Sequence, residues 1–238
     1  MKNDKGDRMK VLVLLSGGVD SSTCIAILVE EHGKENVFAL CASYGQKHTK
    51  ELMSARTVAD YYKIKLIEVD LTQIFSYSNS SLLSHSESEV PHGTYDEQLK
   101  DNKGGTVSTY VPFRNGLFLS VAASIALSME CEMIYYGAHS GDVVLNAYPD
   151  CSEAFGQAMN TAIYEGSGKK VKVVVPFVNI SKSDIVKKGL ELKVPYEITW
   201  SCYEGNDYSC GKCATCIERE LAFEKNNAID PLVTIRKN

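Results

Sequence analysis

The chain has 238 residues, of which 44% are hydrophobic and 23% are charged. This length suits one large α/β domain or two small ones and excludes a disordered or fibrous protein. The formal net charge of -5 argues against a nucleic-acid partner, because nonspecific binding depends on lysine and arginine neutralising phosphates. The first apolar run, at residues 11–15, is too short for a signal sequence or a membrane span, so we expect a cytoplasmic protein with no membrane partner.

Short apolar runs alternate with stretches of helical periodicity, a pattern typical of βαβ units around a parallel sheet. The first run lacks polar alternation, as expected of a strand that is covered on both faces. Strands are predicted at residues 11–15, 37–43, 65–70, 133–138 and 171–176. Apolar residues at helical spacing follow the first two strands, and further helices are predicted at residues 115–129, 152–165 and 182–192. The sequence therefore predicts an α/β fold.

Two parts of the chain depart from this alternation. Residues 76–109 are rich in Ser, Gly, Asn, Asp and Glu and are far longer than an ordinary loop, so they form either a lid or a flexible insertion. The tail from Trp200 carries four cysteines and indicates a small metal-bound appendage. We therefore divide the chain into a main domain at residues 9–199 and a C-terminal helical segment at residues 200–238.

The string SGGVDSS at residues 16–22 stands between the first strand and its helix. Two glycines let the backbone turn tightly and let an anion approach its N–H groups, while the helix N-terminus adds free donors and partial positive charge. Asp20 in such a loop either caps the helix or faces a magnesium ion that bridges phosphates. The simpler alternative is a capped Gly-Gly turn, but the position of the whole string favours a phosphate-binding loop.

Four of the eight cysteines have the spacing C-x7-C-x2-C-x2-C. They are Cys202, Cys210, Cys213 and Cys216. Four thiolates on tight turns can close a tetrahedral shell, which describes a structural zinc site. The last three also match the start of an iron–sulfur spacing, although the fourth cysteine lies upstream, so zinc is favoured over a cluster.

The string at residues 16–22 resembles the PP-loop of ATP pyrophosphatases, a family that includes GMP, NAD and asparagine synthetases and tRNA-modifying enzymes. The resemblance implies a Rossmann-like adenine nucleotide alpha hydrolase fold that binds ATP and Mg²⁺, in which a substrate oxygen attacks the α-phosphate and pyrophosphate leaves. The residues it assigns to the nucleotide are Leu15, Ser16, Gly17, Gly18, Val19, Asp20, Ser21, Ser22, Thr23, Cys24, Ile25, Tyr44 and Gln46.

Four further strings, together with the cysteines, narrow the resemblance to the family of 7-cyano-7-deazaguanine synthases of the queuosine and archaeosine pathways. They are VPFRN at residues 111–115, GAHS at 137–140, NAYPDC at 146–151 and WSCY at 200–203. The similarity runs from Leu15 to about Glu220. One departure is Phe113, which stands where this family often has glycine.

This resemblance implies an ATP-dependent ligase that converts 7-carboxy-7-deazaguanine and ammonia to 7-cyano-7-deazaguanine through an adenylated carboxylate and an adenylated amide. It also implies bound Zn²⁺ and a homodimer. The catalytic residues that follow are Ser16, Asp20, Arg114 and Lys182, and the substrate-binding residues are Arg114, Asn115 and Asp150. Simpler interpretations stand beside these roles: a surface ion pair for Arg114, a turn cap for Asp150 and a solvated helix face for Lys182.

Two other functions compete with this one. A tRNA-modifying PP-loop enzyme of the thiolase type would need a basic surface or an RNA-binding module, and the acidic charge balance speaks against it. A zinc-ribbon module that only binds a partner would not need Asp20 in its phosphate loop.

Overall fold

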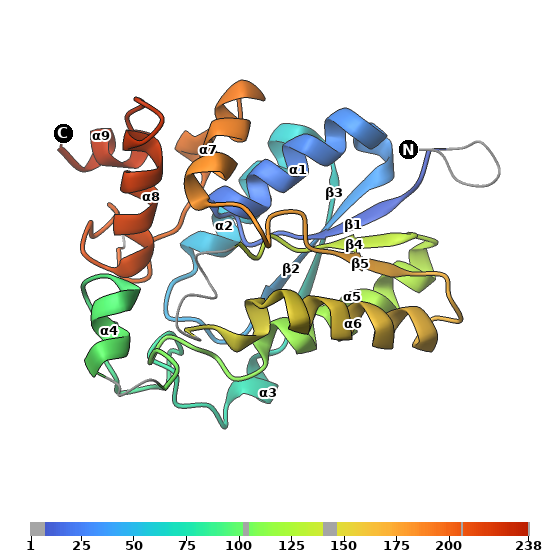
Figure 1. Ribbon diagram of the computed structural model, residues 1–238, viewed down its shortest axis with the longest axis horizontal. Helices are drawn as coiled ribbons and strands as arrows, with labels where there is room; N and C mark the ends of the chain where they lie inside the picture. Colours follow the sequence, from blue (N-terminus) through green and yellow to red (C-terminus); the bar gives the residue numbers. More distant parts are fainter. Residues whose placement is uncertain (1–7, 102–104, 140–146, 206, 238) are drawn as a thin grey trace.

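The computed structural model describes residues 8–101, 105–139, 147–205 and 207–237. Within it, five strands form one sheet in the order β3-β2-β1-β4-β5, and every neighbouring pair is parallel (Figure 1). The strands are β1 (Val11–Leu14), β2 (Val37–Ser43), β3 (Lys65–Asp70), β4 (Met133–Tyr135) and β5 (Lys172–Val174). The α/β fold with a parallel sheet is therefore confirmed.

Helices cover both faces of this sheet (Figure 1). One face carries α1 (Val19–His32), α2 (Lys50–Tyr62), α7 (Lys182–Glu191) and α8 (Ala214–Glu224). The other face carries α5 (Arg114–Met129) and α6 (Glu153–Gly166). The central strand supplies both layers, because Val11 and Val13 pack with the first group and Leu12 with the second. Burial on both faces accounts for the continuous apolar run of β1.

Three strands are shorter than the sequence predicts. β4 ends at Tyr135 instead of residue 138, β1 ends at Leu14, and β5 covers Lys172–Val174 only. At β4 the cause is the neighbouring phosphate loop: a Cβ atom on Gly137 would lie 3.3 Å from the Asp20 Cβ. The regular strand ends there, and the chain passes close to α1 and lines the cavity, although the Tyr136 N–H still donates to the Val174 carbonyl at 3.3 Å and His139 forms an isolated β-bridge with Phe177.

Residues 76–109 are more ordered than a flexible insertion, although 102–104 lie outside the described residues. The segment follows α3 (Thr72–Phe75) and contains α4 (Tyr95–Asp101), which the sequence did not predict. Leu83 pairs with Gln46, and His92 pairs with Cys213, each in an isolated β-bridge. The segment therefore packs between the end of β2 and the cysteine-containing tail.

Short helical turns and one terminal helix complete the described structure. They are the 3-10 turns η1 (Lys34–Asn36), η3 (Pro149–Cys151) and η4 (Tyr196–Ile198), and helix α9 (Pro231–Lys237). Helix α7 begins with a capping box between Ser181 and Asp184, as the S-x-x-D spacing predicts. Across the described residues, every helix falls short of the length and apolar character needed to cross a bilayer.

Arg219 joins the C-terminal segment to the main domain. It lies in α8 with 1% of its surface exposed and donates to Asp230 Oδ2 at 2.8 Å, to Thr199 Oγ1 at 2.8 Å and to the Tyr196 carbonyl at 3.0 Å. The Tyr196 hydroxyl in turn lies 2.7 Å from Thr23 Oγ1 in α1. This buried chain of polar contacts fixes the tail against the helix that carries the phosphate loop.

We expect Arg219→Met to lower the free energy of unfolding by about 3–5 kcal/mol, because it leaves the Asp230 carboxylate buried without its ion pair. Urea unfolding followed by circular dichroism measures this. Arg56→Met is the control, since Arg56 forms an exposed pair with Glu68 and its loss should barely move the midpoint. Equal midpoints for both variants would contradict the role of the buried pair.

Candidate active site

A cavity of about 230 Å³ opens at the carboxyl ends of β1 and β4, where the strand order reverses. Ligands of open α/β sheets bind at such a switch point. The phosphate loop forms one part of its wall, Tyr44 after β2 forms another, and Lys182 from α7 a third. Trp200 and Tyr203 extend the wall from the cysteine-containing tail. Residues from both ends of the chain therefore share one cavity.

The phosphate loop is packed tightly against α2. Gly17 has a φ of 81°, and a Cβ atom there would lie 2.5 Å from the Ala55 nitrogen and 2.7 Å from the Glu51 carbonyl. Only glycine fits this position. The Trp200 N–H donates to the Gly17 carbonyl at 2.9 Å, so the tail also holds the loop. Helix α1 starts at Val19 without a side-chain cap, and its first residues, Val19 to Ser21, line the cavity, so the N–H groups of the first turn are available there.

Asp20 and Lys182 form an ion pair beside this loop. The Lys182 Nζ lies 2.5 Å from Asp20 Oδ2 and 3.5 Å from His139 Nε2. Asp20 Oδ1 is buried and, among the described residues, has no hydrogen-bond partner; the same holds for the Ser22 hydroxyl. A carboxylate oxygen left in this state is a suitable ligand for a hard cation such as Mg²⁺. The residues at this point therefore fit a magnesium ion next to bound phosphates.

Arg114 begins α5 and extends into the cavity. Its Nη1 donates to the Tyr44 hydroxyl at 3.1 Å, and its guanidinium lies 5.0 Å from the centre of the Tyr44 ring. Burial opposes the charge of this guanidinium, but the oxygens of Tyr44, Tyr203, Asp150 and Glu51 outweigh that effect and raise its pKa above the ordinary value. Arg114 therefore provides a permanent positive charge in the cavity.

The structure accounts for Phe113 at the position where the family often has glycine. Its φ is 55°, in the left-handed region that favours glycine, and its ring packs edge-on against Phe155 at 5.8 Å. The side chain lies against Gly116, where a Cβ atom would clash with the ring at 2.3 Å. The backbone conformation that glycine would adopt freely is thus retained here by aromatic packing.

Asp150 lies behind the cavity wall and holds the start of α5. Its Oδ2 accepts from the Asn115 backbone N–H at 2.9 Å, and the Asn115 side-chain amide donates to the Asp150 carbonyl at 3.3 Å. Among the described residues, Asn115 lines the cavity and Asp150 does not. A carboxylate that receives a helix N-terminal N–H positions Arg114 and Asn115.

Apart from Asp150 and the cysteines of the tail, the predicted site residues fall into two groups, those that line the cavity and those that lie behind it. Lining the cavity are Leu15, Ser16, Gly18, Val19, Asp20, Ser21, Tyr44, Gln46, Arg114, Asn115 and Lys182. Behind it lie Gly17, Ser22, Thr23, Cys24 and Ile25. The side chains of this second group from Ser22 onward are buried in α1, and burial raises the pKa of the Cys24 thiol well above its usual range. Ser140 and Asn146, which belong to the strings that suggested the family, lie outside the described residues.

Three tyrosine hydroxyls meet at the cavity, and the sequence analysis missed them. Tyr95 and Tyr203 lie 3.2 Å apart, and Tyr148 lies 3.4 Å from each. Thr109 is 2.6 Å from the Tyr148 hydroxyl. Burial raises the pKa of all three tyrosines, so they are neutral. Tyr95 comes from α4, Tyr148 from the segment before η3 and Tyr203 from the cysteine-containing tail. A local sequence pattern does not predict contacts between segments so far apart in the chain.

Glu51 is a second cavity residue that sequence reasoning missed. It stands in the first turn of α2 and lines the cavity together with Arg114. Burial raises the pKa of its carboxyl to about 7, an effect that the positive charge of Arg114 partly offsets. A possible signal was its place shortly after Tyr44 and Gln46, but in a helical pattern an isolated acid is normally a solvated residue.

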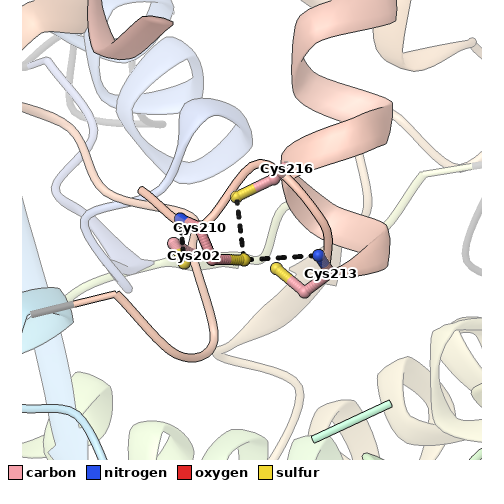
Figure 2. Close-up of side chains that lie close together, drawn as sticks. All are labelled: Cys202, Cys210, Cys213 and Cys216. Atoms are coloured by element: carbon pink, nitrogen blue, oxygen red, sulfur yellow. Dashed lines mark hydrogen bonds between the residues drawn. The ribbon is translucent and has the colours of Figure 1, made fainter. Parts of the chain in front are cut away.

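The four predicted cysteines converge on one point (Figure 2). Their sulfur atoms all lie within 4.8 Å of one another. Backbone N–H groups donate to them, including Gly205 to Cys202 at 3.0 Å and Lys212 to Cys210 at 3.4 Å. A closed set of four sulfurs with N–H support is the donor set of a structural metal centre.

The whole chain has close relatives of known class. It matches the family model described as Queuosine biosynthesis protein QueC over residues 10–227. It is 43% identical over 227 residues to a 7-cyano-7-deazaguanine synthase of Archaeoglobus fulgidus, covering 95% of this chain and 90% of that protein. A relative with the same name from Hahella chejuensis is 42% identical over 223 residues, covering 94% and 92%.

Two solved structures share the fold. The U34-tRNA thiolase NcsA from Methanococcus maripaludis with its 4Fe-4S cluster has a TM-score of 0.53 and 16% identity, covering 99% of this chain and 73% of its own. NMN synthetase from Francisella tularensis has a TM-score of 0.51 and 15% identity, covering 94% and 79%. At this identity the likeness concerns the fold alone. The family model and the sequence relatives both extend across nearly the whole chain, and the protein therefore belongs to the QueC family of queuosine biosynthesis proteins.

Proposed function

We propose that the protein is an ATP-dependent carbon–nitrogen ligase that converts 7-carboxy-7-deazaguanine and ammonia to 7-cyano-7-deazaguanine in queuosine or archaeosine biosynthesis. The observation that carries this proposal is the phosphate loop with its Asp20–Lys182 pair, built into a cavity of a QueC family member. The loop supplies N–H groups for a leaving pyrophosphate, and the cavity supplies Arg114 for a reacting carboxylate.

The proposed reaction passes twice through an adenylate. A carboxylate oxygen of the substrate attacks the α-phosphorus of ATP, and pyrophosphate leaves. Ammonia then displaces AMP from the acyl carbon to give the amide. The amide oxygen attacks a second ATP, and loss of AMP with the remaining amide protons leaves the nitrile. Each adenylation turns a poor leaving group into a good one, so no thiol nucleophile is needed.

The chain's own residues would position the nucleotide for these steps. Ser16, Gly18 and Ser21 surround the place where the phosphates would lie, and Lys182 adds a positive charge there. Mg²⁺ would be held by Asp20, whose buried Oδ1 lacks a hydrogen-bond partner among the described residues, and would neutralise charge on the departing pyrophosphate. Tyr44 and Gln46, after β2, would contact the remainder of ATP.

Zn²⁺ is the metal that we propose for the four cysteines. Four cysteine sulfurs that converge on one point, three of them on buried residues, suit zinc and a structural role. The same tail supplies Trp200 and Tyr203 to the cavity wall. A metal there would hold that wall in place, and residues 200–238 would form the zinc-binding segment attached to the catalytic domain at residues 9–199.

The test is direct. The protein is incubated with ATP, Mg²⁺, ammonium and 7-carboxy-7-deazaguanine, and the products are analysed by mass spectrometry and by assays for AMP and pyrophosphate. We expect the nitrile, with two AMP released for each molecule. Release of ADP, or AMP release that depends on tRNA instead of the small acid, would contradict the proposal; the second result would favour a tRNA-modifying enzyme.

We expect Arg114→Lys to lower kcat/KM for the carboxylate substrate by about 10- to 100-fold. Lysine keeps the charge but loses the planar group that contacts Tyr44 and could bind an anion through two N–H groups. Steady-state kinetics measure the change. Arg56→Lys, in an exposed pair with Glu68, is the control and should behave as wild type. An unchanged kcat/KM in Arg114→Lys would remove Arg114 from substrate binding.

We further propose a cytoplasmic homodimer that acts without nucleic-acid or membrane partners. The family resemblance supports the dimer, and the net charge of -5 speaks against an RNA surface. Light scattering coupled to gel filtration gives the oligomeric state. A single monomeric species at micromolar concentration would contradict the dimer.

A further inference from the structure

Among the described residues, three carboxyl groups face the cavity, and they differ in their partners. Asp20 is paired with Lys182 at 2.5 Å, and Glu218 from α8 lies near the hydroxyl of Tyr95. Glu51 is the third, and among the described residues its carboxyl forms neither a hydrogen bond nor an ion pair. Glu51 is half-buried in the cavity wall, and an acid that lines a cavity without a protein partner points to a ligand.

The chemistry of the proposed reaction limits what this ligand can be. ATP, the substrate carboxylate, AMP and pyrophosphate are anions, and a carboxylate in their cavity repels them. Ammonium is the one cationic reactant. In the part of the chain that the structure describes, the charged groups that face the cavity with Glu51 are Asp20 from α1, Arg114 from α5, Lys182 from α7 and Glu218 from α8. Lys182 is paired with Asp20, and the Arg114 guanidinium, which donates to the Tyr44 hydroxyl, acts on the Glu51 carboxyl through its charge without a hydrogen bond between them.

Resting on the proposed function, we propose that Glu51 binds the incoming ammonium ion and accepts the proton that converts it to the ammonia nucleophile. Its place suits this role, because α2 packs its first turn directly on Gly17 of the phosphate loop, beside which the adenylate would form. A carboxyl whose pKa burial has raised to about 7 is ionised often enough to attract ammonium and basic enough to take its proton.

Protons and electrons balance in the proposed step. Ammonium gives one proton to the Glu51 carboxylate, and the freed nitrogen lone pair attacks the carbonyl carbon of the acyl adenylate. The carbon–nitrogen bond forms as the carbon–oxygen bond to AMP breaks, and AMP leaves with that electron pair. The nitrogen loses its second proton to water, and Glu51 releases its own proton to water before the next turnover. No oxidant or reductant takes part.

Three assays on Glu51→Gln distinguish ammonium binding and deprotonation from a role in nucleotide or substrate binding. The first is exchange of labelled pyrophosphate into ATP with the carboxylate substrate and no ammonium, which reports the first adenylation. The second is conversion of the amide 7-amido-7-deazaguanine and ATP to the nitrile, which uses no ammonium. The third is formation of amide and nitrile from the carboxylate, ATP and ammonium. Glu30→Gln, on the exposed face of α1, is the matched control.

We expect Glu51→Gln to keep the first two rates within about threefold of wild type and to lower the ammonium-dependent rate by about 100-fold. The defect should shrink as the pH is raised, because free ammonia then replaces the missing proton acceptor, and Glu51→Asp should restore part of the rate. Glu30→Gln should match wild type in all three assays.

Other outcomes overturn the proposal in recognisable ways. Equal losses in all three assays would assign Glu51 to nucleotide binding or to the N–H edge of the purine, and no loss would remove it from the reaction. The proposed function fails separately: in that case wild-type protein itself shows no exchange with the carboxylate. The exchange rate also reports correct folding of each variant.

Discussion

Asp20→Asn should lower kcat for AMP release by about 1,000-fold while the protein stays folded, the scale of removing one preorganised charge-stabilising group. The carboxylate accepts from Lys182 Nζ at 2.5 Å, and its Oδ1 is the buried oxygen that suits Mg²⁺. Asparagine keeps the shape of the side chain but carries no charge, so it releases Lys182 and weakens the cation site. Steady-state AMP release, with a thermal melt of each variant, measures the effect.

Asp60→Asn is the matched control for this substitution. Asp60 is an exposed residue of α2 that pairs with Lys63 at 3.1 Å, so its loss should leave kcat unchanged. Full activity in Asp20→Asn would remove the phosphate loop from the mechanism. A collapse of the melting temperature in that variant would instead show that the Asp20–Lys182 pair holds the fold.

Cys213→Ser should lose the bound metal and most of the stability of the C-terminal segment together. The Cys213 side chain is fully buried among the other three thiols, and a serine hydroxyl is a poor replacement for a thiolate ligand. Loss of a structural metal site is expected to cost about 5 kcal/mol or more, which lowers the melting temperature of a chain of this size by about 10 °C or more. Metal analysis and a thermal melt give both quantities.

Cys131→Ala provides the comparison. Cys131 is a buried thiol in the core layer between the sheet and helices α5 and α6, in one cluster with Leu119 and Ile134. Its replacement should therefore lower the free energy of unfolding only slightly and leave the metal content unchanged. If Cys213→Ser lost activity but kept both its metal content and its melting temperature, the metal would not be structural. The metal analysis also distinguishes zinc from iron. An absorbance spectrum gives a second criterion, because an iron–sulfur cluster absorbs in the visible range and bound zinc does not.

Local patterns were sufficient for several parts of the site. The string at residues 16–22 predicted a phosphate-binding loop because its glycines act within a few residues of chain, and the structure places it between β1 and α1 in the cavity wall. The four cysteines were recognised for the same reason, since close spacing brings sulfurs together on turns. Strand positions followed from continuous apolar runs, although the ends of β4 depended on the approach of Gly137 to Asp20.

Contacts between distant segments decided the rest. Asp150 was expected to contact substrate, whereas the structure places it under the first turn of α5, where it accepts from Asn115. Among the described residues, it lies behind the wall of the cavity. Glu51 was missed because an isolated acid in a helical pattern is normally solvated. Tyr148 and Tyr203 lie in the strings at residues 146–151 and 200–203, but those strings do not indicate that the two hydroxyls meet Tyr95, because the three segments come together only when the sheet assembles.

The amino-acid order alone thus predicted the parallel α/β architecture, the loop at residues 16–22 and the four cysteines that the structure brings together, since periodicity and short spacing govern each of them. Only the tertiary structure determined three other features. They are the acid that lacks a partner among the described cavity residues, the tyrosines whose hydroxyls meet, and the arginine that holds the C-terminal segment. Those features join residues that lie tens to more than a hundred positions apart, such as Tyr95 and Tyr203, and their energies depend on burial, which a linear pattern does not record.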